Sequence, residues 1–138
     1  MVFAGSHAGL LENPSLEQIE TQIDLFQAET ARLLTDIDVM VGDKLPYYVK
    51  ERIRKEVRKR AIEPLKVRDF EWHTLARNNW TAVCSGGVGV ALLHYGTESE
   101  INHYLPRLYE AMEHFLEGYN DDGCCMEGYG YMDKTSYL

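Results

Sequence analysis

Residues 78–95 read NNWTAVCSGGVGVALLHY, and this run decides the fold. Its pattern predicts a helix from Asn79 to Tyr95 with unusually many small residues, namely Ala82, Ser85, Gly86, Gly87, Gly89 and Ala91. A glycine in a helix interior is unfavourable by about 1 kcal/mol relative to alanine. The small residues therefore indicate that neighbouring helices approach this helix closely.

Two helices are predicted before this run. Ser15 and Gln18 form a capping box, and apolar residues at helical spacing predict one long helix from there to Val41, ended by Gly42. Its apolar residues are Leu16, Ile19, Ile23, Phe26, Leu33, Ile37 and Val41. The second helix is predicted from Pro46 to Pro64, with Val49, Ile53, Val57 and Ile62 as its buried stripe. Because the link between the two is short, they are expected to pack as an antiparallel hairpin.

The remaining chain predicts one further helix. It spans about residues 98–119, with an apolar stripe of Ile101, Leu105, Leu108, Met112 and Phe115, and Pro106 is expected to kink or delay it. Residues 65–77 are expected to be an irregular link and residues 1–14 a flexible lead-in to a single domain over residues 15–138. Alternating strand patterns are absent from the sequence, so the predicted fold class is all-α.

The composition excludes several classes of protein. Three cysteines, two of them adjacent, do not make a disulfide framework, so reduced thiols and a cytoplasmic location are expected. Their spacing completes no zinc site, and no metal is expected. No run of about 18 apolar residues is present, which argues against a membrane partner, and the first residues lack the pattern of a signal peptide.

Charge is unevenly distributed in a chain whose net charge is −8. Residues 50–68 carry nine Lys or Arg against three Glu, whereas the other residues carry five Lys or Arg against nineteen Asp or Glu. The basic segment either attracts an anionic polymer or is a solvated helix face. Nucleic acid is not expected as a partner, because the segment has no interleaved aromatic residues for base stacking.

Two motifs mix amide, aromatic, acidic and glycine residues that no core requires. NNWTAVCSGG at residues 78–87 is answered by DGCCMEGYGY at residues 122–131, and the basic run RIRKEVRKRAIEPL precedes both at residues 52–65. In this order, the three segments resemble the α/α-toroid domain of heparinase II/III-like polysaccharide lyases over roughly residues 45–131. The resemblance implies helical hairpins forming part of a toroid, in a fragment that lacks the β-sandwich domain usual in such lyases.

The resemblance also implies an activity, the cleavage of an acidic, uronate-containing polysaccharide or oligosaccharide by β-elimination without a cofactor. Asn79 would neutralise the substrate carboxylate, since an amide donates hydrogen bonds without adding a competing charge, and Tyr131 would transfer the proton. The sugar subsite would be lined by Asn78, Trp80, Tyr129 and Glu127. Lyases of this kind commonly have histidine where Trp80 stands, and tryptophan cannot carry a proton.

Structural roles compete with each assignment. Asn78 or Asn79 could cap the helix, Trp80 could fill the core, and the tyrosines and Glu127 could hold their own loop in shape. Two rival functions remain open: a non-catalytic carbohydrate-binding or scaffold fragment, and a toroid glycoside hydrolase using Asp121 or Asp122. An incomplete toroid exposes apolar helix faces, so self-association is expected.

Other constellations are weaker. Residues 86–89 lack the preceding strand and the following Gly-Lys-Ser/Thr of a phosphate-binding loop. Glu100 and His103 have the spacing of half a di-iron site, but no second pair exists. Cys84 lies about three turns from His94 on one predicted helix, so it is predicted to be a small buried hydrophobe. Asp121 and Asp122 precede Gly123 and are predicted to form a turn.

Overall fold

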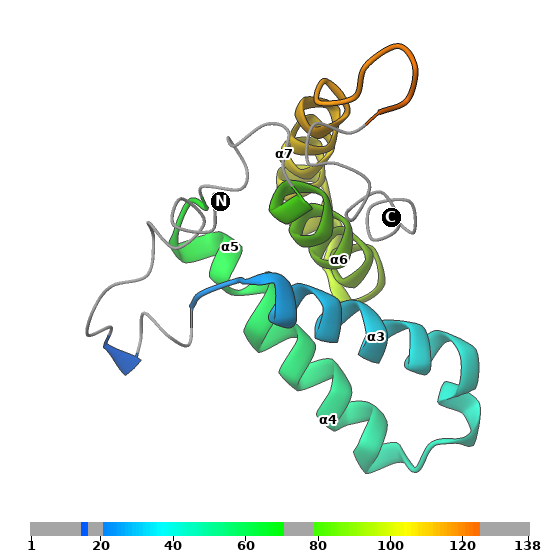
Figure 1. Cartoon of the computed structure of the whole chain (residues 1–138). Helices are drawn as coiled ribbons and strands as arrows, with labels where there is room; N and C mark the ends of the chain where they lie inside the picture. The colour runs from blue at the N-terminus through cyan, green and yellow to red at the C-terminus, as the bar shows by residue number, and fades with distance from the viewer. Residues whose placement is uncertain (1–14, 17–20, 71–78, 125–138) are drawn as a thin grey trace.

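The computed structural model describes residues 15–16, 21–70 and 79–124. These residues form helices and include no strand, so the all-α prediction is confirmed. The principal helices are α3 (Leu25–Val41), α4 (Tyr47–Val57), α6 (Asn79–Tyr95) and α7 (Glu98–Leu116), with a short α5 (Pro64–Val67). Figure 1 shows two hairpins, α3 with α4 and α6 with α7, whose arms run in opposite directions. The predicted lead-in at residues 1–14 lies outside the described residues.

The first long helix begins later than predicted. Residues 21–24 are not helical, and Asp24 has extended backbone angles while its carboxylate accepts a 2.8 Å hydrogen bond from the Gln27 backbone N–H. A side-chain acceptor at this position satisfies one of the free donors at a helix start. The prediction of one helix from Ser15 to Val41 was therefore wrong at its start. It was correct at its end, where Gly42 caps α3 and opens the 3-10 turn η1 (Gly42–Lys44).

The second helix continues beyond the proline that was predicted to end it. After α4, the chain forms a π-helical turn η2 (Arg58–Ile62), in which the Glu63 N–H donates to the Arg58 carbonyl at 2.9 Å. Pro64 then stands at the first position of α5, where its missing N–H leaves no helical bond unmade. The prediction that the helix ends at Pro64 and that the link begins at Leu65 was wrong for this reason.

The third and fourth helices agree with the sequence. Helix α6 has the predicted bounds, and α7 starts at Glu98, where Thr97 and Glu100 form a capping box. Pro106 lies within α7 and is exposed, and α7 is neither delayed nor interrupted there. The helix ends at Leu116, three residues before the predicted end.

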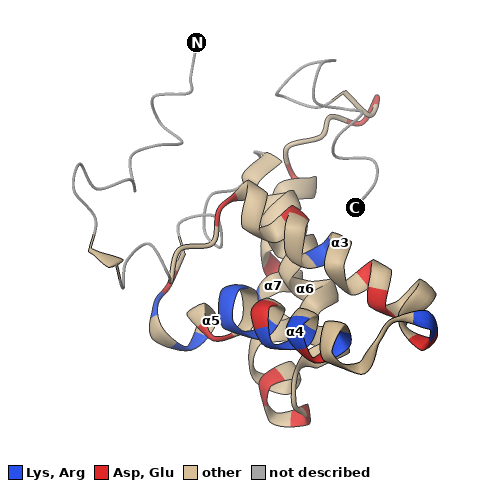
Figure 2. Cartoon of the chain, turned by 90° about the horizontal axis from the view of Figure 1, so that it is seen from below, with Lys and Arg blue, Asp and Glu red and all other residues tan. Residues whose placement is uncertain are grey.

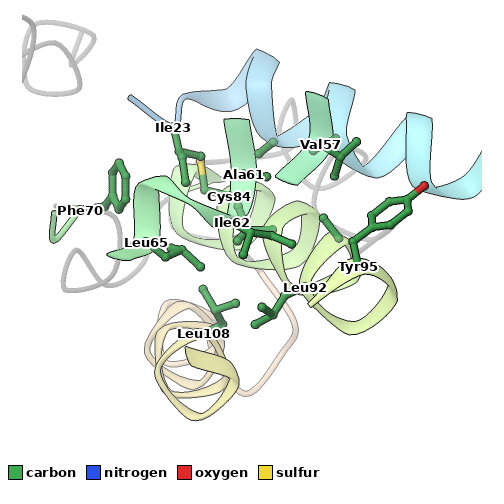
Figure 3. Packing of buried hydrophobic residues seen from close by; sticks show 14 of the residues in the cluster. Ile23, Val57, Ala61, Ile62, Leu65, Phe70, Cys84, Leu92, Tyr95 and Leu108 are labelled. Carbon is green, nitrogen blue, oxygen red and sulfur yellow. The ribbon is translucent and has the colours of Figure 1, made fainter. Parts of the chain in front are cut away.

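Helix α6 is the centre of the core. It packs against α3, against α7 and against η2, and most of its residues are buried. The surrounding side chains include Ile23, Ile62, Leu65 and Leu108, which close around Cys84 and Leu92 of α6 (Figure 3). The prediction of close approach is confirmed at Gly87. A Cβ atom there would press against the Ala28 carbonyl and lie 2.8 Å from its carbon.

This close approach decides which face of α3 is buried. Only small side chains let two backbones come this near, and the buried residues of α3 are Ala28, Ala31 and Thr35. Leu25 and Leu34 are partly buried against the core, whereas Phe26, Leu33 and Met40 are exposed. The predicted apolar stripe of α3 is therefore largely on the outside, because α6 selects the small face.

Over residues 15–16, 21–70 and 79–124, no helix is both long enough and apolar enough to span a bilayer.

Candidate functional site

The first turn of α6 carries the two predicted site residues that the structure describes. Asn79 is the first residue of α6, and its side chain is half-buried. Trp80 is also half-buried, and it packs against the buried core cluster. The indole therefore has at least the structural role that competed with sugar stacking.

The antiparallel packing of α6 and α7 directs the first turn of α6 toward the C-terminal end of α7. A Cβ atom at Gly96 would lie 3.2 Å from Ile101 Cγ1, and one at Gly89 would lie 3.9 Å from Leu108 Cδ1. In this antiparallel pair, a step back along α6 corresponds to an equal step forward along α7 (Figure 1). The first turn of α6 therefore lies toward the C-terminal end of α7, and the second motif begins beyond α7, at Asp122.

The start of the second motif is a tight turn, as predicted. The Gly123 N–H donates to the Asn120 carbonyl at 2.8 Å, and the Asn120 N–H donates to the Cys124 carbonyl at 3.0 Å. Gly123 has φ +80°, a left-handed conformation that glycine adopts without strain. The Asp122 carboxylate accepts a 2.9 Å bond from the Cys124 N–H, so it holds the turn in shape.

The other predicted site residues are Asn78, Glu127, Tyr129 and Tyr131, and all four lie outside the described residues. Their distances from Asn79 stay predictions.

A polar cluster that the sequence did not predict joins α3, α4 and α6 at the other end of α6. The Tyr95 hydroxyl donates to Asp38 Oδ2 at 2.8 Å, and His94 Nε2 lies 3.3 Å from the same oxygen. Lys50 Nζ lies 3.9 Å from Asp38 Oδ1. Gly42 makes room, because a Cβ atom there would lie 2.6 Å from Asp38 Oδ1. The partners come from distant parts of the chain, so the sequence does not predict their contact. The one indication in the sequence is that Asp38 is an acidic residue within the apolar run at residues 37–41.

The electrostatics of this cluster suit a structural role better than proton transfer. We call such a set of polar contacts that holds several helices together a clasp. Burial acts to raise the pKa of Asp38, but hydrogen bonds from Tyr95 and His94 and the charge of Lys50 outweigh it, and the pKa is lowered. Burial, the bond to Asp38 and the Asp38 charge together raise the pKa of Tyr95. A tyrosine with a raised pKa keeps its proton and is a poor base.

A second clasp joins η2 and α5 to the start of α7. Both Arg58 guanidinium nitrogens donate to the Glu100 carboxylate, at 2.9 and 3.2 Å, and Lys66 Nζ lies 2.6 Å from Glu100 Oε1. Arg58 also donates to the Tyr95 carbonyl and to Glu63. The hydrogen bond from Arg58 has the largest effect on the pKa of Glu100. Together with the bonds from Lys66 and the Thr97 N–H, it outweighs burial and lowers this pKa to about 2. Glu100 is thus an anion held in place by Arg58 and Lys66.

Ion pairs engage much of the basic segment. Lys and Arg residues gather on α4 and α5 in Figure 2. Arg58 and Lys66 bind Glu100, and Arg52 and Arg60 both contact Glu56, at 3.0 and 3.1 Å. An exposed pair such as those at Glu56 contributes little to stability, about 0–1 kcal/mol. The segment is therefore partly neutralised and partly solvated.

The thiol and metal expectations can be examined in the described part of the chain. Cys84 is fully buried, and burial raises the pKa of its thiol, so it is the inert hydrophobe that was predicted. Among residues 15–16, 21–70 and 79–124, no three His, Cys, Asp or Glu side chains gather in a way that could hold a metal ion.

Comparisons with known proteins find no match among family models, curated proteins or solved structures.

Proposed function

We propose that this chain forms part of the α/α-toroid domain of a heparinase II/III-like polysaccharide lyase that cleaves uronate-containing polysaccharide by β-elimination. The supporting observation is that α6 and α7 are antiparallel, so that Asn79 at the start of α6 lies toward the end of α7 that leads to the turn at Asp122. The two motifs that the resemblance assigns to one groove therefore start at the same end of the α6–α7 pair (Figure 1).

The proposed chemistry needs no cofactor. The Asn79 amide would donate hydrogen bonds to the uronate carboxylate, which makes the neighbouring C–H proton more acidic. Tyr131 would take that proton or give one to the leaving glycosidic oxygen. Asn78, Trp80, Tyr129 and Glu127 would contact the sugar. A cytoplasmic location is part of the proposal, and the free thiols of Cys84 and Cys124 support it.

A specific observation favours a second candidate, a non-catalytic carbohydrate-binding protein. Trp80 stands where lyases of this kind commonly have histidine, and it is only half-buried, so part of the indole stays accessible. An indole can stack on a sugar face but cannot move a proton. Binding without turnover would then be the whole function. The glycoside hydrolase alternative is less favoured, because Asp122 is engaged in its own turn.

The experiment measures both the reaction product and the binding of polysaccharide. The full product of the reading frame is incubated with uronate-containing polysaccharides, and the unsaturated, ultraviolet-absorbing end group of elimination is followed. We expect Tyr131→Phe to abolish elimination while binding is retained, and Asn79→Ala to weaken both. Binding without any elimination would favour the second candidate, and reducing ends without unsaturation would indicate a hydrolase. Retained turnover in Tyr131→Phe would refute the role of Tyr131.

A further inference from the structure

Helix α3 carries an apolar stripe on the side facing away from α6. We call Phe26, Thr30, Leu33, Ile37 and Met40 the outer stripe. Ile37 is half-buried and the other four are exposed, with 79 % of Phe26 and 80 % of Met40 accessible. A helix with apolar residues on two opposite faces needs a partner for the second one.

The spacing of the outer stripe is that of a helix pair. Its members are separated by four, three, four and three residues, which is the alternation of the apolar positions in a coiled coil. A groove of about 300 Å³ lies alongside, between α3 and α4, and Phe26, Thr30 and Leu34 line it with Val57. The apolar surface therefore extends from the outer stripe toward α4.

The two edges of this surface carry opposite charge. On the side away from α4, Glu29 and Asp36 stand one heptad apart on α3 with Arg32 between them, which forms an ion pair with Asp36 at 3.8 Å and leaves this edge with a net negative charge. On the α4 side, Arg52 and Arg60 flank Glu56, and Lys55 and Lys59 are exposed. The first edge is acidic and the second is net basic.

We propose that the outer stripe is the interface of a two-fold dimer in which α3 of one copy packs parallel to α3 of a second copy. A half-turn about an axis parallel to α3 sets Phe26 against Phe26, Leu33 against Leu33 and Met40 against Met40. It also brings the basic α4 edge of each copy beside the acidic Glu29–Asp36 edge of the other. An antiparallel pairing would join like edges and is disfavoured by charge. The inference does not depend on the proposed lyase activity.

Sedimentation equilibrium of the whole chain tests the interface. We expect a reversible dimer, and Leu33→Ser should raise its dissociation constant about tenfold or more, as for a central apolar contact. Leu93→Ser on α6 is the matched control, because Leu93 and Leu33 are 57 % and 59 % exposed. Circular dichroism checks that both variants fold. A chain that stays monomeric at every concentration, or equal weakening by both variants, would overturn the proposal.

Cysteine cross-linking tests the parallel direction. In a background with Cys124→Ser and Cys125→Ser, Phe26→Cys alone and Met40→Cys alone should each form a disulfide dimer under mild oxidation. An antiparallel dimer would instead join Phe26→Cys to Met40→Cys when the two are mixed, and that result would overturn the arrangement. Glu29→Lys should weaken the parallel dimer, because it places a cation beside the basic α4 edge of the second copy. Tighter association of Glu29→Lys would contradict the charge argument.

Discussion

The Tyr95 hydroxyl donates a 2.8 Å hydrogen bond to Asp38, and this bond ties the last residue of α6 to the last turn of α3. Together with the close contact at Gly87, it fixes α3 against α6 near both ends. The orientation of α3 follows from these two contacts. The contact at Gly87 places the small face of α3 inward, so the large residues of the outer stripe of α3 face outward.

The clasp predicts a loss of stability in Tyr95→Phe. The substitution removes a donor from a carboxylate whose side chain is only 10 % exposed, so we expect the free energy of unfolding to fall by about 1–2 kcal/mol. Urea denaturation measures it. Tyr109→Phe is the control, because Tyr109 is exposed and should change stability by no more than about 0.5 kcal/mol. Equal stability of Tyr95→Phe and the native chain would mean that the bond does not form in solution.

The Arg58–Glu100 clasp predicts a pH dependence. The pKa of Glu100 is about 2 in the folded chain, below its ordinary 4.5. A depressed carboxylate pKa contributes stability that is present above about pH 4.5 and is lost as pH falls toward 2. Relative to the native chain, Glu100→Gln should be less stable by about 2 kcal/mol at neutral pH, and the gap should close through this acid range.

Glutamine is the informative replacement for Glu100, because it can keep the capping bond to the Thr97 N–H. The measured difference then reports on Arg58 and Lys66 and not on the cap. Glu98→Gln, also in the first turn of α7 but exposed, serves as the control. A stability gap that stays constant with pH would show that the carboxylate charge is not its source.

Two glycines of α6 predict opposite effects of the same substitution. Gly87→Ala would drive a methyl group into the Ala28 backbone, so we expect a loss of about 1–3 kcal/mol despite the better helix propensity of alanine. At Gly89 the nearest atom is Leu108 Cδ1 at 3.9 Å, an ordinary contact. Gly89→Ala should therefore be neutral or stabilise by up to about 1 kcal/mol. Thermal denaturation of both variants decides, and a similar change in both would contradict the packing of α3 on α6.

The burial of Cys84 predicts a thiol that reacts only when the chain opens. In the Cys124→Ser, Cys125→Ser background, we expect Cys84 to resist a thiol-specific reagent under native conditions, because burial raises its pKa and denies access. Adding denaturant should bring the reaction rate up together with unfolding measured by circular dichroism. Rapid modification of the native chain would place Cys84 at an accessible site.

Prediction from the sequence succeeded where local signals agreed with packing. The bounds of α6 and the start of α7 were correct, because each depends on residues close to one another in the chain. It failed at Asp24, where a cap overrides the apolar periodicity, and at Pro64, where a π-helical turn lets the helix continue. Of the candidate site, Asn79 and Trp80 were placed at the start of a helix as expected, whereas Tyr131 and its neighbours remain predictions.

The sequence by itself determined that the chain is all-α, that α6 must be approached closely, and that a turn lies at Asp122, since each depends on residues near one another in the chain. Tertiary structure alone decided which face of α3 is buried and which residues clasp it. Asp38 and Tyr95 are 57 positions apart in the sequence, and local sequence patterns do not predict contacts over such a separation. The physical reason is that the backbones of α6 and α3 approach so closely at Gly87 that only small side chains of α3 fit between them, so Phe26 and Met40 face outward.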